Sequence, residues 1–402
     1  MAGHPPSSIL HPRRILVRST NWLGDAVMTT PALLRLREKF PDARITLLTP
    51  EKLKDLWLHH PAVNETISFG PGESVFSVGR KLRRWGEATD EPARGDARPT
   101  GFDLALVLPN SPRSALEVFL AGIPQRLGYT RPWRNFFLTQ TVAPRAGTVK
   151  MRKLSVAEIE RLVAADGSQQ PVFDGGVLPN ATTAHQIHEY LHLAAALGAN
   201  PEPLAPQLFV ATEEIEAAKK KFGLEKMDGP VFGLNPGAEY GPAKRWPVEK
   251  FAAAAKEIQQ RTNCTWLLFG GKSDAAITSQ IESAIGNRQS AIFNLAGKSS
   301  LRELMALLKL CRVLLTNDTG PMHVAAALGT PVVVPFGSTS PELTGPGLPG
   351  DAQNHLLKSD AACSPCFLRA CPIDFRCMNG ISVERVVETV LEIHRRDAET
   401  RR

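Results

Sequence analysis

The chain has 402 residues, 43% of them hydrophobic and 22% charged, which is the composition of a globular protein with two or three domains. No stretch approaches the roughly 20 consecutive apolar residues that cross a bilayer, and residues 1–12 lack the features of a signal peptide, so we expect a cytoplasmic protein. The net charge of +7 arises from the first 160 residues, where 23 Lys and Arg accompany 15 Asp and Glu; this excess indicates an anionic partner or a solvated basic face.

The first half of the chain begins with a strand, a loop, a helix and a second strand. Residues 14–18 are a short β-branched run that predicts a strand, and residues 26–40 carry apolar side chains at helical spacing. Pro31 interrupts this stretch and is expected to kink it or to begin a second helix. Residues 44–48 and 103–108 predict further strands, so the pattern indicates a parallel sheet covered by helices.

Two other segments of the first half invite different interpretations. Residues 86–101 are rich in Gly, Pro and charged residues and are expected to form a flexible surface insertion. Residues 181–197 predict a helix on which His185, His188 and His192 recur at spacings of three and four. Such a set could bind a metal, but polar positions on a helix near a domain junction are the simpler interpretation.

The second half also alternates strands with helices, which predicts a second α/β domain beginning near residue 204. The expected strands are residues 231–234, 266–269, 313–315 and 332–334. Residues 382–395 predict a final helix.

A long polar loop follows the first strand of this second domain. Residues 235–247 contain Gly237, which lets a ligand approach the backbone, and the cations Lys244 and Arg245. In an open α/β sheet, ligands bind beyond the carboxyl ends of the strands, so the loop is a candidate diphosphate site. A surface loop with incidental cations is the alternative, because the P-loop pattern is absent.

Two more loops follow strands of the same domain. Residues 316–323 lead into a helix whose free backbone amides favour phosphate, and they include Asp318, Thr319 and His323. Residues 336–341 form a third polar loop. Because the three loops belong to one parallel sheet, we expect them to converge on one ligand.

The first domain has a corresponding loop at residues 19–25, which ends at Asp25. A carboxylate at the start of a helix usually stabilises the helix, and this is the simpler interpretation of Asp25 taken alone. Residues 109–114 form a second polar loop at a strand end. Two Rossmann-like domains that face each other across a cleft are typical of sugar-nucleotide transferases.

The six cysteines fall into two groups. Cys264 and Cys311 lie in apolar runs and are expected in the core. The other four, Cys363, Cys366, Cys371 and Cys377, form a cluster whose spacing is only loosely that of a zinc site. A structural metal there is the less favoured interpretation, and free thiols are the alternative.

Several segments of the chain resemble those of glycosyltransferase family 9. The segment at 236–247 is long and unusual, whereas that at 316–323 is shared by the wider family. The matching segments run in order through nearly the whole chain: 21–25, 108–111, 121–124, 236–247, 294–297 and 316–323.

The resemblance implies the GT-B fold, an α/β architecture of two Rossmann-like domains facing across a cleft. Residues 1–200 would be the acceptor-binding domain, with its insertion at 86–101, and residues 201–381 the domain that binds ADP-heptose. Residues 382–402 would form a helix that crosses back to the N-terminal domain.

The resemblance also implies an inverting transfer of L-glycero-D-manno-heptose from ADP-heptose to the first heptose of the lipopolysaccharide inner core, with no metal or other cofactor required. Asp25 matches the family's catalytic carboxylate, and Lys244 matches the lysine that contacts the diphosphate. We assign the donor site to Gly237, Ala238, Glu239, Lys244, Asp318, Thr319, Gly320 and His323.

The implied acceptor is a heptosyl-Kdo–lipid A at the inner face of the inner membrane, where the chain would be a peripheral protein. We expect cations of the first domain to contact its anionic groups, and no nucleic-acid partner. The candidate cations are Arg80, Lys81, Arg83, Arg84, Arg113, Arg131 and Arg134. The alternatives are a heptosyltransferase of another core position or glycan, a GT-B-fold nucleotide-sugar epimerase, and a non-catalytic sugar-nucleotide-binding protein.

Overall fold

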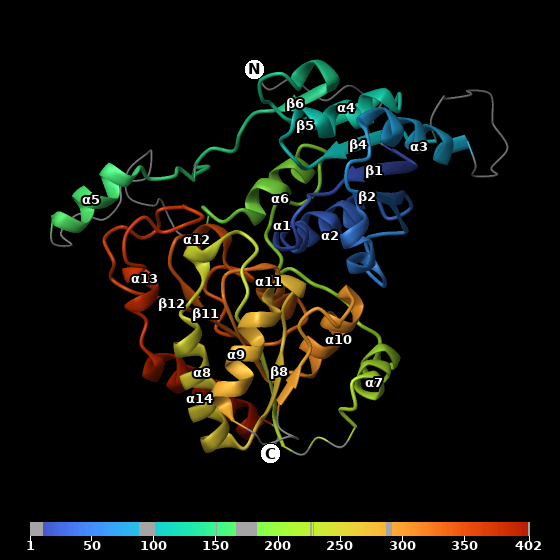
Figure 1. Cartoon of the computed structure of the whole chain (residues 1–402). Helices are drawn as coiled ribbons and strands as arrows, with labels where there is room; N and C mark the ends of the chain where they lie inside the picture. Colours follow the sequence, from blue (N-terminus) through green and yellow to red (C-terminus); the bar gives the residue numbers. More distant parts are fainter. Residues whose placement is uncertain are drawn as a thin grey trace. The chain divides into compact units, whose positions relative to one another are not determined.

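A computed structural model shows two units of the chain (Figure 1). The described residues are 11–87, 101–149, 151–165, 183–225, 227, 229–286 and 292–400. The first unit comprises residues 1–148 and 186–208, and the second comprises residues 149–185 and 209–402. The insertion predicted at residues 86–101 lies almost entirely outside the described residues. None of the helices in the described ranges is long and apolar enough to span a bilayer.

The described part of the first unit contains a parallel sheet of six strands in the order β3-β2-β1-β4-β5-β6. The strands are β1 (Arg14–Arg18), β2 (Arg44–Pro50), β3 (Glu65–Phe69), β4 (Leu104–Val107), β5 (Gln125–Tyr129) and β6 (Gln140–Val142). The helices are α1 (Leu23–Met28), α2 (Thr30–Lys39), η2 (Glu51–Trp57), α3 (Val75–Glu87), α4 (Pro112–Leu120), η3 (Asn135–Phe137) and α6 (Ile187–Ala195).

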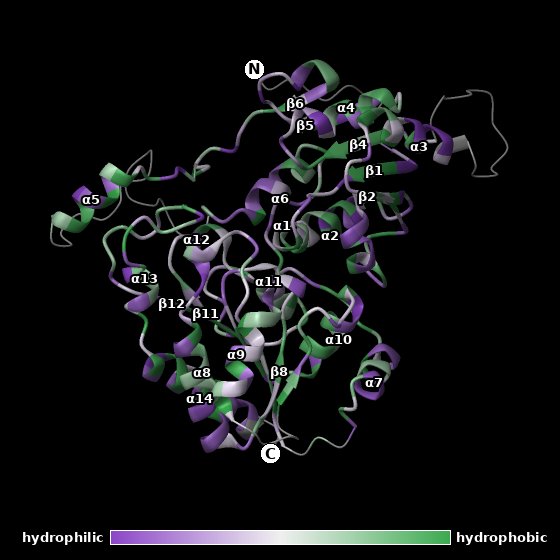
Figure 2. Ribbon diagram, viewed as in Figure 1, coloured by the Kyte–Doolittle hydropathy of each residue, from purple (hydrophilic) through white to green (hydrophobic). Residues whose placement is uncertain are grey.

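The central strands of this sheet are apolar on both faces because helices cover both sides. Ile15, Leu16 and Val17 of β1 are all fully buried, and β4 is coloured as hydrophobic in Figure 2. Pro31 lies in the first turn of α2 and separates it from α1, as predicted. The ring removes a backbone donor that an uninterrupted helix would need, so two short helices replace one long helix.

The second unit repeats this architecture. Its described sheet is also parallel, with the order β12-β11-β10-β7-β8-β9. The strands are β7 (Val231–Asn235), β8 (Thr265–Leu268), β9 (Ile292–Asn294), β10 (Val313–Thr316), β11 (Val332–Phe336) and β12 (Asn354–Lys358). The helices are α5 (Val156–Ala164), α7 (Thr212–Lys221), η4 (Pro242–Lys244), α8 (Val248–Thr262), η5 (Lys272–Asp274), α9 (Ala275–Ile285), α10 (Leu301–Leu310), α11 (Gly320–Ala327), α12 (Pro341–Thr344), α13 (Arg376–Asn379) and α14 (Val383–Thr400).

Each sheet reverses its strand order once, which creates a crevice at the carboxyl ends of two adjacent strands. The reversal lies between β1 and β4 in the first unit and between β7 and β10 in the second. The predicted loops at 19–25 and 109–114 follow the first pair, and those at 235–247 and 316–323 follow the second pair. The expectation of two Rossmann-like α/β domains is thus confirmed, and the candidate residues stand where ligands bind in such folds.

The final helix corrects one prediction. We expected residues 382–402 to cross back to the N-terminal domain, but α14 packs beside α8 in the core of the second unit (Figure 1). Val386, Val387 and Val390 are fully buried there in a cluster with Phe232 and Trp266. The valines form one apolar stripe, and the nearest apolar surface able to cover it belongs to β7, β8 and α8.

The domain boundaries also differ from the expected 1–200 and 201–381. The second unit takes residues 149–185 out of the predicted N-terminal domain, and the chain leaves the first unit finally after Leu208. Leu154, just before α5, and Ile159, within it, pack against Cys363 and Cys366 of the second unit. That contact attaches this segment to the second unit.

The position of α14 leads to a stability prediction. Val387→Ala removes buried methyl groups from the core, so we expect the unfolding free energy of the second unit to fall by roughly 2 kcal/mol. Urea unfolding followed by tryptophan fluorescence measures this, because Trp246 and Trp266 lie in the same core. The exposed Glu388 on the same helix supplies the control, since Glu388→Ala loses only a surface ion pair with Arg261. Equal effects of the two changes would contradict the placement of α14.

Candidate functional site

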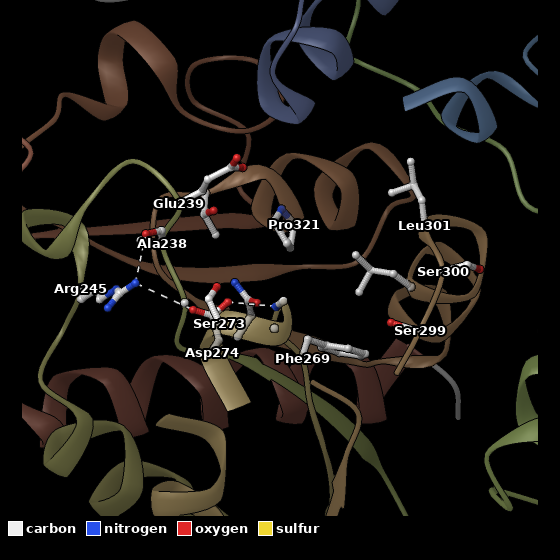
Figure 3. Close-up of a pocket in the computed structure, with 16 residues that line it drawn as sticks. Ala238, Glu239, Arg245, Phe269, Ser273, Asp274, Ser299, Ser300, Leu301 and Pro321 are labelled. Atoms are coloured by element: carbon white, nitrogen blue, oxygen red, sulfur yellow. Dashed lines mark hydrogen bonds and ion pairs between the residues drawn. The ribbon is translucent and has the colours of Figure 1, made fainter. Parts of the chain in front are cut away.

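A cavity of about 500 Å³ opens at the carboxyl ends of the strands in the second unit (Figure 3). It is formed by loops after β7, β8, β9 and β10 and by the first turns of α10 and α11. Its walls are Asn235, Gly237, Ala238, Glu239, Arg245, Phe269, Gly270, Gly271, Ser273, Asp274, Ser299, Ser300, Leu301, Leu304, Thr319 and Pro321. The size suits a small ligand with both polar and apolar parts.

One side of the cavity is polar. In Figure 3, Arg245 points toward the backbone oxygen of Ala238 and toward Asp274, at 3.4 Å from Ala238 O and 3.8 Å from Asp274 Oδ1. Asp274 also accepts a 2.9 Å hydrogen bond from the backbone amide of Gly271. A Cβ atom at Gly237 would lie 2.5 Å from Asp274 Oδ2, so only glycine lets the loop pass this close to the carboxylate.

The other side of the cavity is more apolar. Figure 3 shows Phe269 and Leu301 on the side opposite Arg245, with Pro321 between them and Glu239. Ser300 caps α10 by accepting from the backbone amide of Glu303, which fixes this wall. A flat apolar ring would bury surface against these side chains while a charged group occupies the polar side.

A buried ion pair stands behind the cavity. Lys244 Nζ lies 2.6 Å from Asp318 Oδ2, and their side chains are only 13% and 4% exposed. Thr339 donates its hydroxyl to the same carboxylate oxygen at 2.5 Å, and the Lys244 ammonium lies 4.9 Å from the centre of the Tyr240 ring. The pair therefore joins the loops that follow β7, β10 and β11, as predicted for three converging loops.

Asn317 holds two of these loops together. Its amide nitrogen donates to Pro236 O at 2.7 Å, and its side-chain oxygen accepts from the Trp246 backbone amide at 2.9 Å. Both ends of the 236–246 loop are therefore tied to β10 through one fully buried side chain. These two hydrogen bonds hold the loop that carries Lys244 in place.

The segment containing the four cysteines braces the same loop from outside. Gly241 passes so close to Arg369 that a Cβ atom would collide with its carbonyl oxygen, and Ala243 N donates to that oxygen at 3.0 Å. Tyr240 donates its hydroxyl to Phe367 O at 2.9 Å. Ser364 donates to Gly337 O at 2.7 Å, so the cysteine segment also contacts the loop after β11.

The cysteine thiols themselves are mostly buried. Burial raises the pKa of Cys377 to about 12 and also raises the pKa values of Cys363 and Cys366. These thiols are therefore protonated at neutral pH. Among the side chains that the structure describes, no group of three or more His, Cys, Asp and Glu is arranged to hold a metal ion.

Two of the three histidines singled out by spacing, His185 and His192, have partners in different units. His185 belongs to the second unit, where its ring nitrogen Nε2 lies 2.9 Å from Gly345 O, whereas His192 belongs to the first unit and stacks on Tyr129. His323, in the first turns of α11, is buried, and burial lowers its pKa to about 4. His323 is consequently neutral at physiological pH.

In the first unit, Asp25 lies in the first turn of α1. Gln186 Nε2 is 3.5 Å from Asp25 Oδ1 and donates to the Tyr190 hydroxyl at 2.8 Å. Burial, together with the charge of Asp25, raises the pKa of Tyr190 well above its usual value, so the phenol stays protonated. Gln186 was not anticipated from the sequence, because it reaches Asp25 from 161 residues away along the chain.

A second buried ion pair supports the loop that leads to Asp25. Arg18, at the end of β1, forms a 2.8 Å ion pair with Glu117 of α4, and both side chains are almost completely buried. The same guanidinium donates to Asn21 Oδ1 at 3.0 Å. Arg18 therefore connects the 19–25 loop to the end of β1 and to α4, and these contacts hold the loop in place.

The predicted residues are only partly gathered in the cavity wall. Gly237, Ala238, Glu239 and Thr319 line it, whereas Lys244 and Asp318 form the pair behind it. Gly320 is the first residue of α11, which places the helix amides next to Thr319. Arg245 was noted as a cation, but Phe269, Asp274 and the 299–304 segment were missed; the glycines at 270 and 271 after β8 were the available signal.

Comparison with known proteins places this geometry among sugar transferases. Residues 97–375 match the family model "Glycosyltransferase family 9 (heptosyltransferase)". Lipopolysaccharide heptosyltransferase 2 of Escherichia coli K12 is 32% identical over 83% of this chain and 85% of that protein, and its Salmonella typhimurium counterpart is 33% identical over the same shares. The solved E. coli ADP-heptose lps heptosyltransferase II has a TM-score of 0.71 at 28% identity and covers 96% of this chain and 99% of that one.

The contact between Gly241 and Arg369 leads to a prediction. Gly241→Ala forces the loop away from the Arg369 carbonyl, so we expect the unfolding free energy of the second unit to fall by about 1–3 kcal/mol. Urea unfolding followed by tryptophan fluorescence measures the change. Gly70→Ala is the matched control, because a Cβ atom there would have no neighbour within 4 Å. An unfolding free energy unchanged by Gly241→Ala would show that this close contact places no constraint on the loop.

Proposed function

The chain belongs to glycosyltransferase family 9, and we propose that it transfers L-glycero-D-manno-heptose from ADP-heptose to the first heptose of the lipopolysaccharide inner core. The observation that carries this proposal is the similarity to proteins named lipopolysaccharide heptosyltransferase 2 over 83% of the chain. The two sheets with GT-B-like neighbours agree with it. The epimerase and the non-catalytic alternatives have no comparable support.

The second unit is the proposed donor domain. Its cavity offers an apolar wall at Phe269 and Leu301 for the adenine ring and a polar wall at Arg245 for charged or hydroxyl groups. Gly237, Ala238, Glu239 and Thr319 would contact ADP-heptose from the strand-end loops. We assign the diphosphate to the region between this wall and the first turn of α11, where backbone amides and Lys244 provide positive potential.

The first unit is the proposed acceptor domain, with Asp25 as the general base. A sugar hydroxyl is a weak nucleophile at neutral pH, and a carboxylate within hydrogen-bond reach can remove its proton as the new glycosidic bond forms. Gln186 orients the Asp25 carboxylate, and the Arg18–Glu117 pair supports the loop that carries it. Attack on the anomeric carbon from the side opposite the diphosphate gives inversion.

Departure of ADP places additional negative charge on the diphosphate. Lys244 is already desolvated and held by Asp318, so little reorganisation is needed when that charge develops. Neutral His323 would serve as a hydrogen-bonding group in the donor site. In this mechanism the cation and the helix amides balance the leaving group, and no metal takes part. The acceptor would be presented at the inner face of the inner membrane.

The base assignment predicts the behaviour of Asp25→Asn. We expect the transfer rate to fall by about 10²–10⁴-fold, because the amide cannot accept the proton. ADP affinity, measured by titration, should stay within about twofold, since the residue lies outside the donor unit. Asp42→Asn removes an exposed carboxylate of the same unit and should leave the rate unchanged. A full rate in Asp25→Asn would refute the role of Asp25.

The acceptor position is tested with defined acceptors. The full chain is incubated with ADP-heptose and either Kdo–lipid A or the same molecule carrying one heptose. The masses of the products are measured by mass spectrometry. We expect addition of one heptose only to the acceptor that already has one. Transfer to heptose-free Kdo–lipid A would assign another core position. Conversion of ADP-heptose without any acceptor would contradict the transferase proposal.

A further inference from the structure

The most exposed large hydrophobic side chains in the described ranges belong to one short segment of the first unit. Trp133 is 90% exposed and Phe136 is 81% exposed, and both lie between β5 and β6. Phe119 at the end of α4 is 38% exposed, and its ring centre lies 6.3 Å from that of Phe136. We call Phe119, Trp133 and Phe136 the aromatic platform. Burial of aromatic side chains of this size lowers the free energy of a protein. Their joint exposure on one surface therefore indicates a binding surface.

The platform is held rigidly. Arg131 N donates to Asn135 Oδ1 at 2.9 Å, and Leu138 N donates to Asn135 O at 3.1 Å, so the segment is tied at both ends. Between them, Arg134 is fully buried and donates to Asn110 Oδ1 at 3.2 Å. Because Arg134 points inward, the residues on either side of it are held outward.

The backbone at Trp133 adds a second observation. Its φ is +62°, in the left-handed region that bulky L-residues rarely adopt. Packing of the indole does not offset this strain, because the side chain is almost fully exposed. A strained conformation that presents an apolar side chain to solvent is characteristic of a contact site.

The charge around the platform is positive. From Val118 to Thr148, where the chain stays in the first unit, the sequence contains no Asp or Glu but four cations, namely Arg126, Arg131, Arg134 and Arg145. Arg126 lies over the Phe119 ring at 5.3 Å, and Arg131 lies over the Tyr129 ring at 5.7 Å. The Tyr129 ring is buried, whereas that of Phe119 is partly exposed. Cations beside exposed rings such as Phe119 suit the headgroup region of a bilayer, where the rings enter the interface and the cations meet anionic lipid.

Helix α3 extends this surface beyond α4. The two helices pack together, with Gly79 of α3 against Leu120 of α4. Phe76 of α3 is 65% exposed, and its exposed cations are Arg80, Arg83 and Arg84. Figure 2 shows α3 and α4 adjacent in the first unit, with hydrophilic and hydrophobic segments mixed along them. The same combination of aromatic and cationic side chains therefore occurs in α3 and in the segment between β5 and β6, and both elements contact α4.

We propose that the aromatic platform docks the first unit onto an anionic lipid bilayer, with Trp133 and Phe136 entering the interface and Arg131 and the α3 cations contacting lipid phosphates. The choice of a lipid surface rests on the proposed function, whose acceptor has a lipid anchor. The contact itself requires neither donor nor acceptor, so it can be measured separately from transfer.

The test is co-sedimentation of the full chain with vesicles of phosphatidylcholine alone or with about a quarter phosphatidylglycerol. We expect binding to the anionic vesicles, weakened by added salt, and little binding to the neutral ones. Trp133→Ser with Phe136→Ser should weaken binding on the order of tenfold for each aromatic residue removed. Leu58→Ser, at a residue 48% exposed elsewhere in the same unit, is the matched control and should bind normally.

A water-soluble truncated acceptor separates this proposal from the transferase proposal. The double variant should transfer heptose to it at the wild-type rate, which also shows that the variant is folded. Unchanged vesicle binding by the double variant would overturn the docking proposal even if transfer is normal. So would sedimentation of the wild-type chain as a dimer that the double variant cannot form, or tighter binding to a single-stranded oligonucleotide than to anionic vesicles.

Discussion

The ion pair between Lys244 and Asp318 is the interaction on which the second unit's site depends. It joins loops from three strands, and it does so where water is nearly excluded. A buried lysine without a carboxylate would lose its charge or draw in water, and a buried carboxylate alone would be equally unfavourable. The 2.6 Å contact therefore gives each of the two side chains the partner that its burial requires. The result is a lysine held in a fixed position behind the wall of the cavity.

The main features of this arrangement follow from the sequence by a short physical argument. Alternating strands and helices predict parallel sheets, and parallel strands deliver their following loops to one edge. That is why Gly237 and Thr319, 82 residues apart, could be predicted to share a site. Asp274 and Gln186 could not, because their positions depend on how a short turn and a distant helix pack. Local patterns carry no information about such packing.

The two incorrect predictions, of the position of α14 and of the domain boundary, also arise because local sequence patterns do not specify packing. The stripe of Val386, Val387 and Val390 correctly indicates an amphipathic helix, but it does not say which surface covers the stripe. Likewise, the sequence predicts that the residues around α5 belong to the first domain, because they directly follow its strands along the chain. Their apolar contacts with Cys363 and Cys366 decide otherwise. The cysteine segment, uncertain as a metal site from its spacing, instead supports the loop of Lys244 through Gly241 and Tyr240.

The division of the chain into units has a consequence for synthesis. The backbone passes between the units three times, after residues 148, 185 and 208. Helix α6, which packs against α2, is therefore made only after a segment that belongs to the other unit. As the chain leaves the ribosome, the first sheet must wait with one helix face uncovered until residue 208 has emerged. Residues 149–185, in turn, are made early but must wait for the rest of the second unit, so the two units are not synthesised simply one after the other.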